Sequence, residues 1–245
     1  MSGMARAAVA LITGSGMNDR FRVGDRVLVR TEFGPVTLYR CTTHGEDFFL
    51  LPRHGLRHTL PPHMINFRAN LKALESVGVG SVFATSAVGS ISGKLRVGEI
   101  GLVDQFIDFS SRHLTYFDSR PAHVDMTTPY DKALQRVVLG AAREAGQKMT
   151  RGLVYVSVDG PRYETAAEIR AFRLLGGDVV GMTGAPEVIL ARELGIAYAS
   201  VVVATNMAAG LQPKVSHDEV EDVMDRAGPR LKHILELSLK AANRI

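Results

Sequence analysis

A threonine and an asparagine stand close behind an apolar run near the end of the chain. The run 196–203 predicts a buried strand, and Thr205 and Asn206 are expected just past its carboxyl end. Open α/β sheets bind ligands at such positions. The Asn206 amide carries a donor and an acceptor, so it can recognise the edge of a neutral heterocycle. The alternative is an asparagine that caps a turn.

A basic loop follows another predicted strand and contains Arg53, His54, Arg57 and His58. Arginine forms bidentate hydrogen bonds with phosphate, and histidine adds a further donor. The loop therefore favours an anion site, and the alternative is a solvated basic turn.

Smaller polar groups stand near other predicted strand ends. Residues 14–16, Gly-Ser-Gly, form a tight turn whose N–H groups and Ser15 hydroxyl can hold an anion, although a plain turn explains it equally well. Ser86 and Thr183 also suit an anion. Glu164, expected in the first turn of a helix, suits a neutral heterocycle. The alternative is a glutamate that stabilises the helix dipole.

These groups must be positioned by strands and helices, which the hydrophobic pattern predicts. Predicted strands cover residues 7–13, 27–40 with a turn at 33–35, 47–51, 81–85, 100–107, 153–157, 178–180 and 196–203. Predicted helices cover residues 64–77, 131–145, 163–175, 182–194 and 216–242, the last with a capping box of Ser216 and Glu219. Residues 86–90 are expected to be a polar segment after a strand, and residues 113–123 a long loop with a functional or interface role.

The alternation of strands, polar turns and helices predicts the α/β class, with a central mixed β-sheet flanked by helices on both faces. The chain has 245 residues, and 46% of them are hydrophobic, which is enough for a sizeable core. No repeat, low-complexity tract or linker divides it, so residues 1–245 are predicted to form a single domain.

Charge and cysteine content narrow the class of protein further. The net charge of +4 and the pI of about 9.3 suggest anionic ligands, but the basic residues are scattered and form no arm or clustered face. A small phosphate ligand explains this charge as well as nucleic acid does, and a nucleic-acid binder would bind with steep salt dependence.

Cys41 is the only cysteine, so an intrachain disulfide and a cysteine zinc site are excluded and a reducing cytoplasm is expected. No apolar segment suits a signal peptide or a membrane span. Neither nucleic acid nor membrane is an expected partner.

The order of these segments resembles the purine nucleoside phosphorylase and methylthioadenosine phosphorylase family of the trimeric type, over nearly the whole chain. The matching segments are Thr13–Gly16, Arg53–Gly55, His58–Thr59, Asn66, Ala84–Ala87, Asp104–Asp108, Gly160–Arg162, Gly181–Thr183, Pro186–Glu187 and Thr205–Asn206. The resemblance implies one α/β domain, assembled as a homotrimer or a dimer of trimers. It also implies phosphorolysis, in which phosphate and a purine nucleoside give free base and a pentose 1-phosphate, without cofactor or metal. The absence of a Ser-His-Asp or His-Glu-x-x-His motif fits a reaction in which the bound anion attacks directly.

The resemblance also implies roles for individual residues. Asn206, Glu164 and His54 match catalytic positions. The implied phosphate-binding residues are Ser15, Arg53, His54, Ser86, Ala87 (through its backbone N–H) and Thr183. The implied nucleoside-binding residues are Tyr163, Glu164, Met182, Asn206, Ala208 and His217, together with His123 from the neighbouring subunit.

Three positions indicate which purine is used. Members of the family that act on 6-aminopurines resemble one another in a Thr-Asp-x-Asp segment, where this chain has Asn206 and Ala208 in place of both acids. They also have a small hydroxyl residue where Glu164 stands. A 6-oxopurine carries an N1–H that can donate a hydrogen bond to the Glu164 carboxylate. Adenine has a lone pair at N1 instead, so the buried carboxylate would have no donor to face. We therefore predict phosphorolysis of inosine or guanosine.

The 5′ end of the nucleoside is indicated by His217, which resembles the histidine that bonds a 5′-hydroxyl group in this family. A solvated histidine is the alternative. S-methyl-5′-thioinosine (or methylthioadenosine) is the alternative substrate, because some relatives with the Asn206 pattern prefer methylthioinosine. A non-catalytic nucleoside-binding module on the same fold is a remoter alternative, which phosphate-dependent release of hypoxanthine from inosine would exclude.

Overall fold

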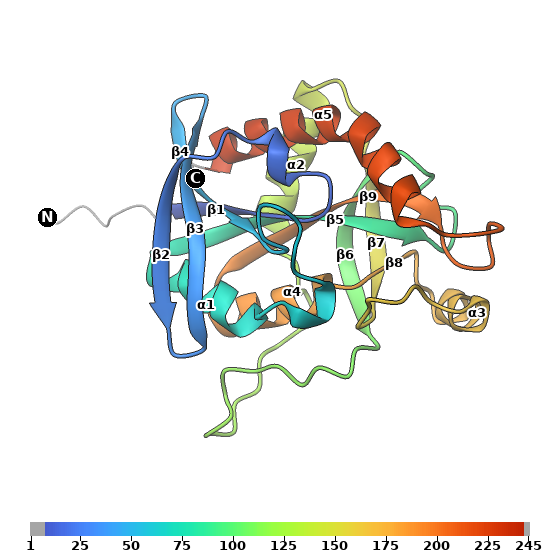
Figure 1. Cartoon of the computed structure of the whole chain (residues 1–245), viewed down its shortest axis with the longest axis horizontal. Helices are drawn as coiled ribbons and strands as arrows, with labels where there is room; N and C mark the ends of the chain where they lie inside the picture. Colours follow the sequence, from blue (N-terminus) through green and yellow to red (C-terminus); the bar gives the residue numbers. More distant parts are fainter. Residues whose placement is uncertain (1–7, 243–245) are drawn as a thin grey trace, which may run out of the picture.

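The strands within residues 8–242, the part of the chain that the computed structural model describes, form one mixed sheet of nine strands (Figure 1). They are β1 (Ala8–Thr13), β2 (Asp25–Thr31), β3 (Gly34–Thr43), β4 (Glu46–Pro52), β5 (Val79–Ser90), β6 (Ile100–Asp108), β7 (Thr150–Ser157), β8 (Val179–Gly181) and β9 (Ala197–Met207). Their order is β2-β3-β4-β1-β5-β8-β7-β6-β9. The predicted α/β class with a mixed sheet is confirmed. Residue Ala7 of the predicted first strand lies outside the described residues, and a single domain over residues 1–245 stays a prediction.

Five of the strands close on themselves. β5 pairs with β8 and β9, β6 pairs with β7 and β9, and β7 pairs with β8. A closed arrangement leaves these strands without a long free edge. The central strands β5 and β9 are buried over most of their length, which explains why their apolar residues do not alternate with exposed polar ones. The closure was not predicted, because local hydrophobicity does not specify which strands pair.

Helices cover both faces of the sheet. In Figure 1, α1 and α4 lie on one face, α2 and α5 lie on the other, and α3 lies at one end. Their bounds are α1 (Phe67–Ser76), α2 (Lys132–Glu144), α3 (Ala166–Leu174), α4 (Gly184–Glu193) and α5 (His217–Ala242), with short 3-10 helices η1 (Asn18–Arg20) and η2 (Pro62–Met64). The apolar stripes of α1 and α4 enter one buried cluster, and those of α2 and α5 enter a second cluster across the sheet. None of the described helices is long and apolar enough to cross a membrane.

β5 and β9 continue further than the apolar pattern predicts. Residues 86–90, expected after a strand, are the last residues of β5, and Thr205 and Asn206, expected past a strand, lie within β9. The parallel pairing of the two strands skips Thr205, so β9 carries a bulge directly before Asn206. A bulge redirects the side chain beside it.

Glu164 lies before α3 and not in its first turn. Thr165 is the N-cap residue, and it exchanges hydrogen bonds with Glu168 in a capping box. Glu168 therefore occupies the place beside the helix dipole, and the dipole explanation of Glu164 is wrong. The capping box predicted for Ser216 and Glu219 is only half formed. The Ser216 hydroxyl accepts from the Glu219 N–H at 3.4 Å, while the Glu219 carboxylate bonds a glutamine side chain.

The predicted long loop is confirmed and is part of a longer irregular segment, residues 109–131, between β6 and α2. It runs out beside α1 and α4 (Figure 1). Tyr116 ties it to both helices, because its hydroxyl donates to the Arg68 carbonyl at 2.7 Å and its N–H donates to the Glu193 carboxylate at 2.7 Å.

Candidate active site

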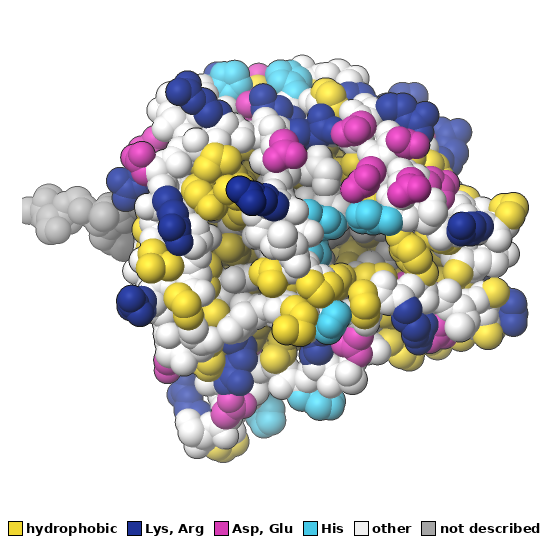
Figure 2. Space-filling model, viewed as in Figure 1, with side chains coloured by type: hydrophobic (Ala, Val, Ile, Leu, Met, Phe, Trp, Pro, Cys, Tyr) yellow, Lys and Arg dark blue, Asp and Glu magenta, His cyan; other side chains and the backbone are white. Residues whose placement is uncertain are grey.

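A cavity of about 440 Å³ lies among the carboxyl-terminal parts of β1, β4, β5 and β9 and the starts of α4 and α5. Figure 2 shows a hollow near the middle of one face, with histidine side chains along its rim. Most of the predicted site residues share one property, which is that they line this cavity. They are Ser15, Arg53, His54, Ser86, Ala87, Tyr163, Glu164, Met182, Thr183, Asn206 and His217. The fold therefore brings together groups that are far apart in the sequence.

Two predicted residues do not line the cavity. Ala208 is buried behind its wall, in an apolar cluster with Ile91 and Val180, and its contact with the nucleoside stays a prediction. A Cβ atom on Gly89, which does line the cavity, would lie 3.4 Å from the Ala208 Cβ. The Ala208 N–H bonds the Ser90 carbonyl and continues the pairing of β9 with β5. His123 is an exposed residue of the segment 109–131. Its predicted role is to contact the nucleoside in the site of a neighbouring subunit, and this stays a prediction.

One wall of the cavity offers donors for an anion. β1 pairs with β5 as far as Ala84, and β8 pairs with β5 only from Gly89, so the edge of β5 between them has no strand beside it. Backbone N–H groups on such an edge are open to a ligand. Ser86 and Ala87 lie on this edge, which agrees with their predicted roles toward phosphate.

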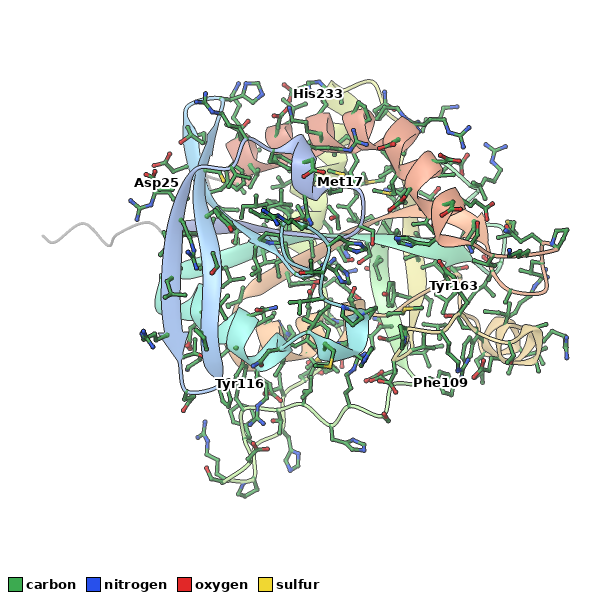
Figure 3. All side chains as sticks on the ribbon, viewed as in Figure 1. Met17, Asp25, Phe109, Tyr116, Tyr163 and His233 are labelled. Atoms are coloured by element: carbon green, nitrogen blue, oxygen red, sulfur yellow. The ribbon has the colours of Figure 1, made fainter. Side chains whose placement is uncertain are left out.

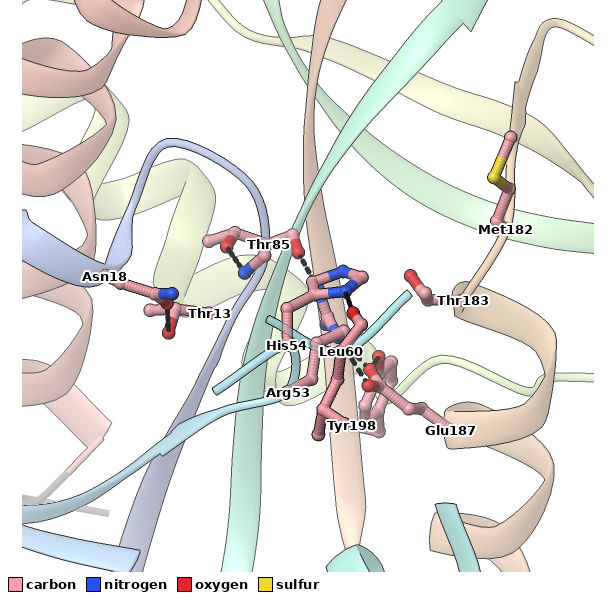
Figure 4. Close-up of polar contacts among 12 residues, drawn as sticks. Thr13, Asn18, Arg53, His54, Leu60, Thr85, Met182, Thr183, Glu187 and Tyr198 are labelled. Atoms are coloured by element: carbon pink, nitrogen blue, oxygen red, sulfur yellow. Dashed lines mark hydrogen bonds and ion pairs between the residues drawn. The ribbon is translucent and has the colours of Figure 1, made fainter. Parts of the chain in front are cut away.

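Arg53 is fixed at the back of this wall (Figure 4). Its Nε and Nη2 lie 2.6 and 2.8 Å from the two carboxylate oxygens of Glu187, and its Nη1 donates to the Thr85 carbonyl at 2.5 Å. The Tyr198 hydroxyl donates to Glu187 at 2.6 Å. Arg53 is 2% exposed and Glu187 is 1% exposed, so this is a buried, fully paired ion pair.

The ion pair changes the predicted role of Arg53. The Nε and Nη2 side of the guanidinium is occupied by Glu187, so a bidentate contact with phosphate could use only the other N–H groups. A guanidinium has five N–H groups, and the three bonds to protein leave one on each terminal nitrogen for a ligand. A Cβ atom on Gly14 would lie 2.6 Å from Nη1, so the glycine turn provides the space that the guanidinium needs.

His54 presents an acceptor to the cavity when its ring is neutral. Its Nδ1 lies 2.8 Å from the Leu60 carbonyl, which can only accept, so we assign the ring hydrogen to Nδ1. Burial, aided by the charge of Arg53, lowers the pKa of His54 to about 4. In the neutral ring the lone pair is then on Nε2, where His54 can donate to phosphate only when it is protonated, so its predicted donor role stays a prediction.

Met182 and Thr183 join β8 to α4 at another wall of the cavity. Thr183 is the N-cap residue of α4, and its hydroxyl makes no capping bond. Its N–H and that of Gly184 lie 3.3 Å from the Tyr155 hydroxyl, and Thr183 lines the cavity at a helix end that favours anions. The Arg112 guanidinium, from residues 109–131, donates to the Met182 carbonyl at 3.1 Å and to the Asp159 carbonyl at 2.5 Å. Arg112 thus ties the long loop to the cavity wall.

Asn206 and Glu164 provide the groups suited to a heterocycle. The Thr205 hydroxyl donates to Asn206 Oδ1 at 2.9 Å, and Asn206 Nδ2 donates to the Met207 carbonyl at 2.9 Å. The amide is therefore fixed, with one N–H left for a ligand. Burial raises the pKa of Glu164. Tyr163 precedes it in the sequence. In space, Tyr163 lies between α3 and the start of α5 (Figure 3).

Histidine rings form the rim between this cavity and the solvent. The His54 and His58 rings are 4.7 Å apart, and the rings of His58 and His217 stack at 5.7 Å with an angle of 8°. His58 Nε2 lies 3.1 Å from Ser15 Oγ. The exposed side of His217 faces Glu221, with its Nε2 3.4 Å from that carboxylate. His217 is therefore both a cavity residue and partly solvated.

Comparison with known proteins identifies the family. The sequence model of the phosphorylase superfamily matches residues 8–240. This chain belongs to the phosphorylase superfamily. The predicted family resemblance is therefore confirmed, and the cavity is the candidate active site of a phosphorylase.

Relatives of this phosphorylase agree closely in length. A 6-oxopurine nucleoside phosphorylase of Pyrococcus furiosus is 43% identical, over 95% of this chain and 91% of its own. A protein of Methanopyrus kandleri named "Probable S-methyl-5′-thioinosine phosphorylase" is 42% identical, over 93% of this chain and 90% of its own. Among solved structures, the methylthioadenosine phosphorylase of Schistosoma mansoni in complex with adenine has a TM-score of 0.90 and 29% identity, covering 96% of this chain and 92% of that one.

Some functional residues of the phosphorylase were not predicted from its sequence. Glu187, which bonds Arg53, lies in a segment that matches the family, but no role was predicted for it. The sequence does not indicate which residue pairs with a single glutamate in an apolar helix. Arg112 gave no signal at all. The Leu60 carbonyl sets the His54 tautomer. This is a backbone contact, and the type of residue at position 60 does not predict it. Within residues 8–242, no three His, Cys, Asp or Glu side chains are grouped so that they could hold a metal ion.

Proposed function

We propose that this phosphorylase cleaves 6-oxopurine nucleosides, inosine or guanosine, with inorganic phosphate, and so serves purine salvage in the cytoplasm. The observation that carries the proposal is that Glu164 and a fixed Asn206 amide line the same cavity as the groups suited to phosphate. A 6-oxopurine offers N1–H to the Glu164 carboxylate and N7 or O6 to the Asn206 N–H. The name of the Pyrococcus furiosus relative supports the same substrate class.

In the proposed reaction, phosphate is held below the anomeric carbon. Its proposed contacts are Ser15, the open β5 edge at Ser86 and Ala87, Thr183, the two remaining N–H groups of Arg53 and, as an acceptor for the P–OH hydrogen, His54 Nε2. Holding the nucleophile against the sugar supplies part of the rate by proximity. No residue of the protein needs to attack the substrate.

Bond breaking then places opposite charges on the two parts of the nucleoside. The sugar, which rests on Met182, acquires oxocarbenium character, and the phosphate charge stabilises it. The departing purine gains negative charge, and the Asn206 N–H donates to N7 as a preorganised dipole. The products are the free base and (deoxy)ribose 1-phosphate, and inorganic phosphate is the only co-substrate that the proposed reaction uses.

A panel of nucleosides assayed with phosphate tests the proposal. Inosine, guanosine, adenosine and S-methyl-5′-thioinosine are ranked by kcat/KM. The expected order places both 6-oxopurine nucleosides above adenosine by orders of magnitude. A ranking with adenosine first would refute the proposed base specificity. If none of the four nucleosides is cleaved in the presence of phosphate, the protein is a non-catalytic binding module.

S-methyl-5′-thioinosine is a second candidate substrate, because the Methanopyrus kandleri relative carries that name at nearly the same identity. It shares the 6-oxopurine base and differs only at the 5′ end. His217 and His58, at the cavity rim, are the side chains proposed to read that end.

His217→Met is expected to erase or reverse the preference for inosine over methylthioinosine. A site built to bond a hydroxyl rejects an analogue lacking it more strongly than an apolar pocket rejects an added hydroxyl. The preference for inosine over adenosine should stay unchanged, because other residues read the base. If wild type prefers methylthioinosine and His217→Met changes nothing, His217 is a surface residue.

The binding of hypoxanthine is expected to weaken as the pH falls, starting at a higher pH than an ordinary glutamate would cause. Burial raises the pKa of Glu164, and protonation removes the acceptor for N1–H. His54 does not add to this change near neutral pH, because its pKa is lowered to about 4. Calorimetry without phosphate, which avoids the titration of phosphate itself, measures Kd against pH. The Glu164→Gln variant should show weaker binding without this acid limb, and an unchanged limb in that variant would assign it to another group.

The active unit is proposed to be a homotrimer or a dimer of trimers in which His123 completes a neighbour's site. Mixing His123→Ala subunits with Asn206→Ala subunits should then restore intact sites, at about a quarter of all positions for random assembly of equal amounts. Each variant alone should be strongly impaired. A fully active monomer in light scattering, or no recovery on mixing after subunit exchange, would show that the site does not need a neighbour.

A further inference from the structure

A second hollow, of about 1240 Å³, shares no lining residue with the nucleoside cavity. It is bounded by the segment between β5 and β6, the starts of β6 and β7, α2 from Arg136 onward and the turn after it, and the middle of α5. α2 and α5 pack together on one face of the sheet, which brings residues distant in sequence into one place (Figure 1). The proposed phosphorolysis does not use this hollow.

The hollow is strongly cationic. Its basic lining residues are Lys94, Arg96, Arg136, Arg143, Lys148, Arg151 and Arg230. Among the lining residues the single carboxylate is Glu99, and both its oxygens accept from Arg96, at 2.6 to 3.0 Å. The chain has a net charge of only +4, so the positive charge of the protein is concentrated here. The prediction that the basic residues form no clustered face is therefore wrong, because folding gathers cations that the sequence disperses.

Several of these cations are free to bind a ligand. Lys94 bonds Asp178 and the Gly152 carbonyl, so it is already held by protein. Arg136, Arg143 and Arg151, by contrast, are exposed and make no side-chain hydrogen bond or ion pair with any residue in the range 8–242. Unpaired guanidinium groups facing one concave space repel one another, and a bound anion with several charges relieves that repulsion.

The floor of the hollow is apolar. Leu139 and Met149 are partly exposed and supply its apolar surface, and Ile100 and Ala142, each 2% exposed, lie beneath them. A pocket with an apolar floor and convergent charged groups suits a ligand that has both a flat or apolar part and an anionic part. Inorganic phosphate alone would leave this floor uncovered.

We infer that this hollow binds a nucleoside polyphosphate, with its phosphates among Arg136, Arg143, Lys148 and Arg151 and its base over the apolar floor. Several separate cations call for several phosphates, and arginine pairs with phosphate in bidentate geometry. Nucleic acid would be held along an extended basic stripe, whereas these cations surround a hollow. The site is separate from the proposed phosphorolysis and does not depend on it.

Calorimetric titration with ATP and with inorganic tripolyphosphate, at about 0.15 M salt, tests the inference. Wild type should bind both, and ATP more tightly because its base covers the floor. The triple variant Arg143→Ala, Lys148→Ala and Arg151→Ala should weaken ATP binding by about tenfold or more, since one lost charge-assisted bond already has that effect. Its kcat/KM for inosine should stay at the wild-type value.

The matched control removes three exposed cations elsewhere, through Arg170→Ala, Arg173→Ala and Arg226→Ala, and should leave ATP binding within about twofold, since non-contacting surface changes cost little. Three outcomes would overturn the inference. They are the absence of saturable binding of ATP to wild type, equal affinity for ATP and tripolyphosphate, and duplex DNA binding more tightly than ATP. Equal weakening in the control variant would also overturn it, because the effect would then come from net charge alone.

Discussion

Replacing Arg53 with alanine is expected to give the largest loss of both stability and activity. The change leaves the Glu187 carboxylate buried without its partner, and breaking a buried pair in this way costs about 3–5 kcal/mol of stability. It also removes two N–H groups proposed to face phosphate, and the loss of one preorganised donor lowers kcat by about 10²–10³-fold. Denaturant unfolding and kcat/KM for phosphate measure the two effects separately.

A double variant separates folding from phosphate binding. Arg53→Met combined with Glu187→Leu replaces the buried pair by apolar side chains, which is often neutral or stabilising. It should fold with near wild-type stability and remain inactive. Arg57→Ala is the matched control, because Arg57 is an exposed arginine of the same loop that does not line the cavity. A folded double variant with wild-type kcat/KM for phosphate would show that Arg53 serves stability alone.

Replacing Asn206 with aspartate is expected to narrow the preference for inosine over adenosine. In wild type, Nδ2 donates to the Met207 carbonyl, so an aspartate oxygen in its place would face that carbonyl and favour the protonated acid. A protonated carboxyl has one O–H, which can donate to the Met207 carbonyl or to N7 but not to both, and its carbonyl oxygen can accept from a 6-amino group. Activity on inosine should therefore fall more than activity on adenosine, which gains this acceptor.

Adding Glu164→Ser is expected to shift the preference further toward adenosine, because Glu164 penalises adenine independently at N1. Both residues contact one ligand in the proposal, so their effects need not add. Asn70→Asp is a matched control, since the Asn70 side chain makes no hydrogen bond within residues 8–242 and does not line the cavity. The ratio of kcat/KM for inosine and adenosine is the measurement, and an unchanged ratio in the double variant would remove Asn206 and Glu164 from base recognition.

The sequence allowed the fold class and most cavity residues to be predicted, because polar residues that follow apolar runs meet at strand ends. Ser15, Arg53, Ser86 and Thr183 are of this kind, and all four line the cavity. The exact position of Asn206 was missed because strand pairing, not hydropathy, extends β9 past Thr205.

Long-range pairing explains the other differences. Arg53 looked free to bind phosphate because its partner Glu187 is 134 positions away and nothing local links them. His54 looked like a donor because its tautomer depends on the Leu60 carbonyl. The basic hollow was invisible for the same reason, since Lys94 and Arg230 become neighbours only in the folded chain.

The most direct test of the proposed function measures hypoxanthine released from inosine with and without inorganic phosphate, with adenosine as the paired substrate. We predict rapid release of hypoxanthine from inosine that requires phosphate and yields ribose 1-phosphate in equal amount. Release of adenine from adenosine should be slower by orders of magnitude. Release that is independent of phosphate, or cleavage of adenosine as efficient as that of inosine, would contradict the proposal that this cavity performs phosphorolysis of 6-oxopurine nucleosides.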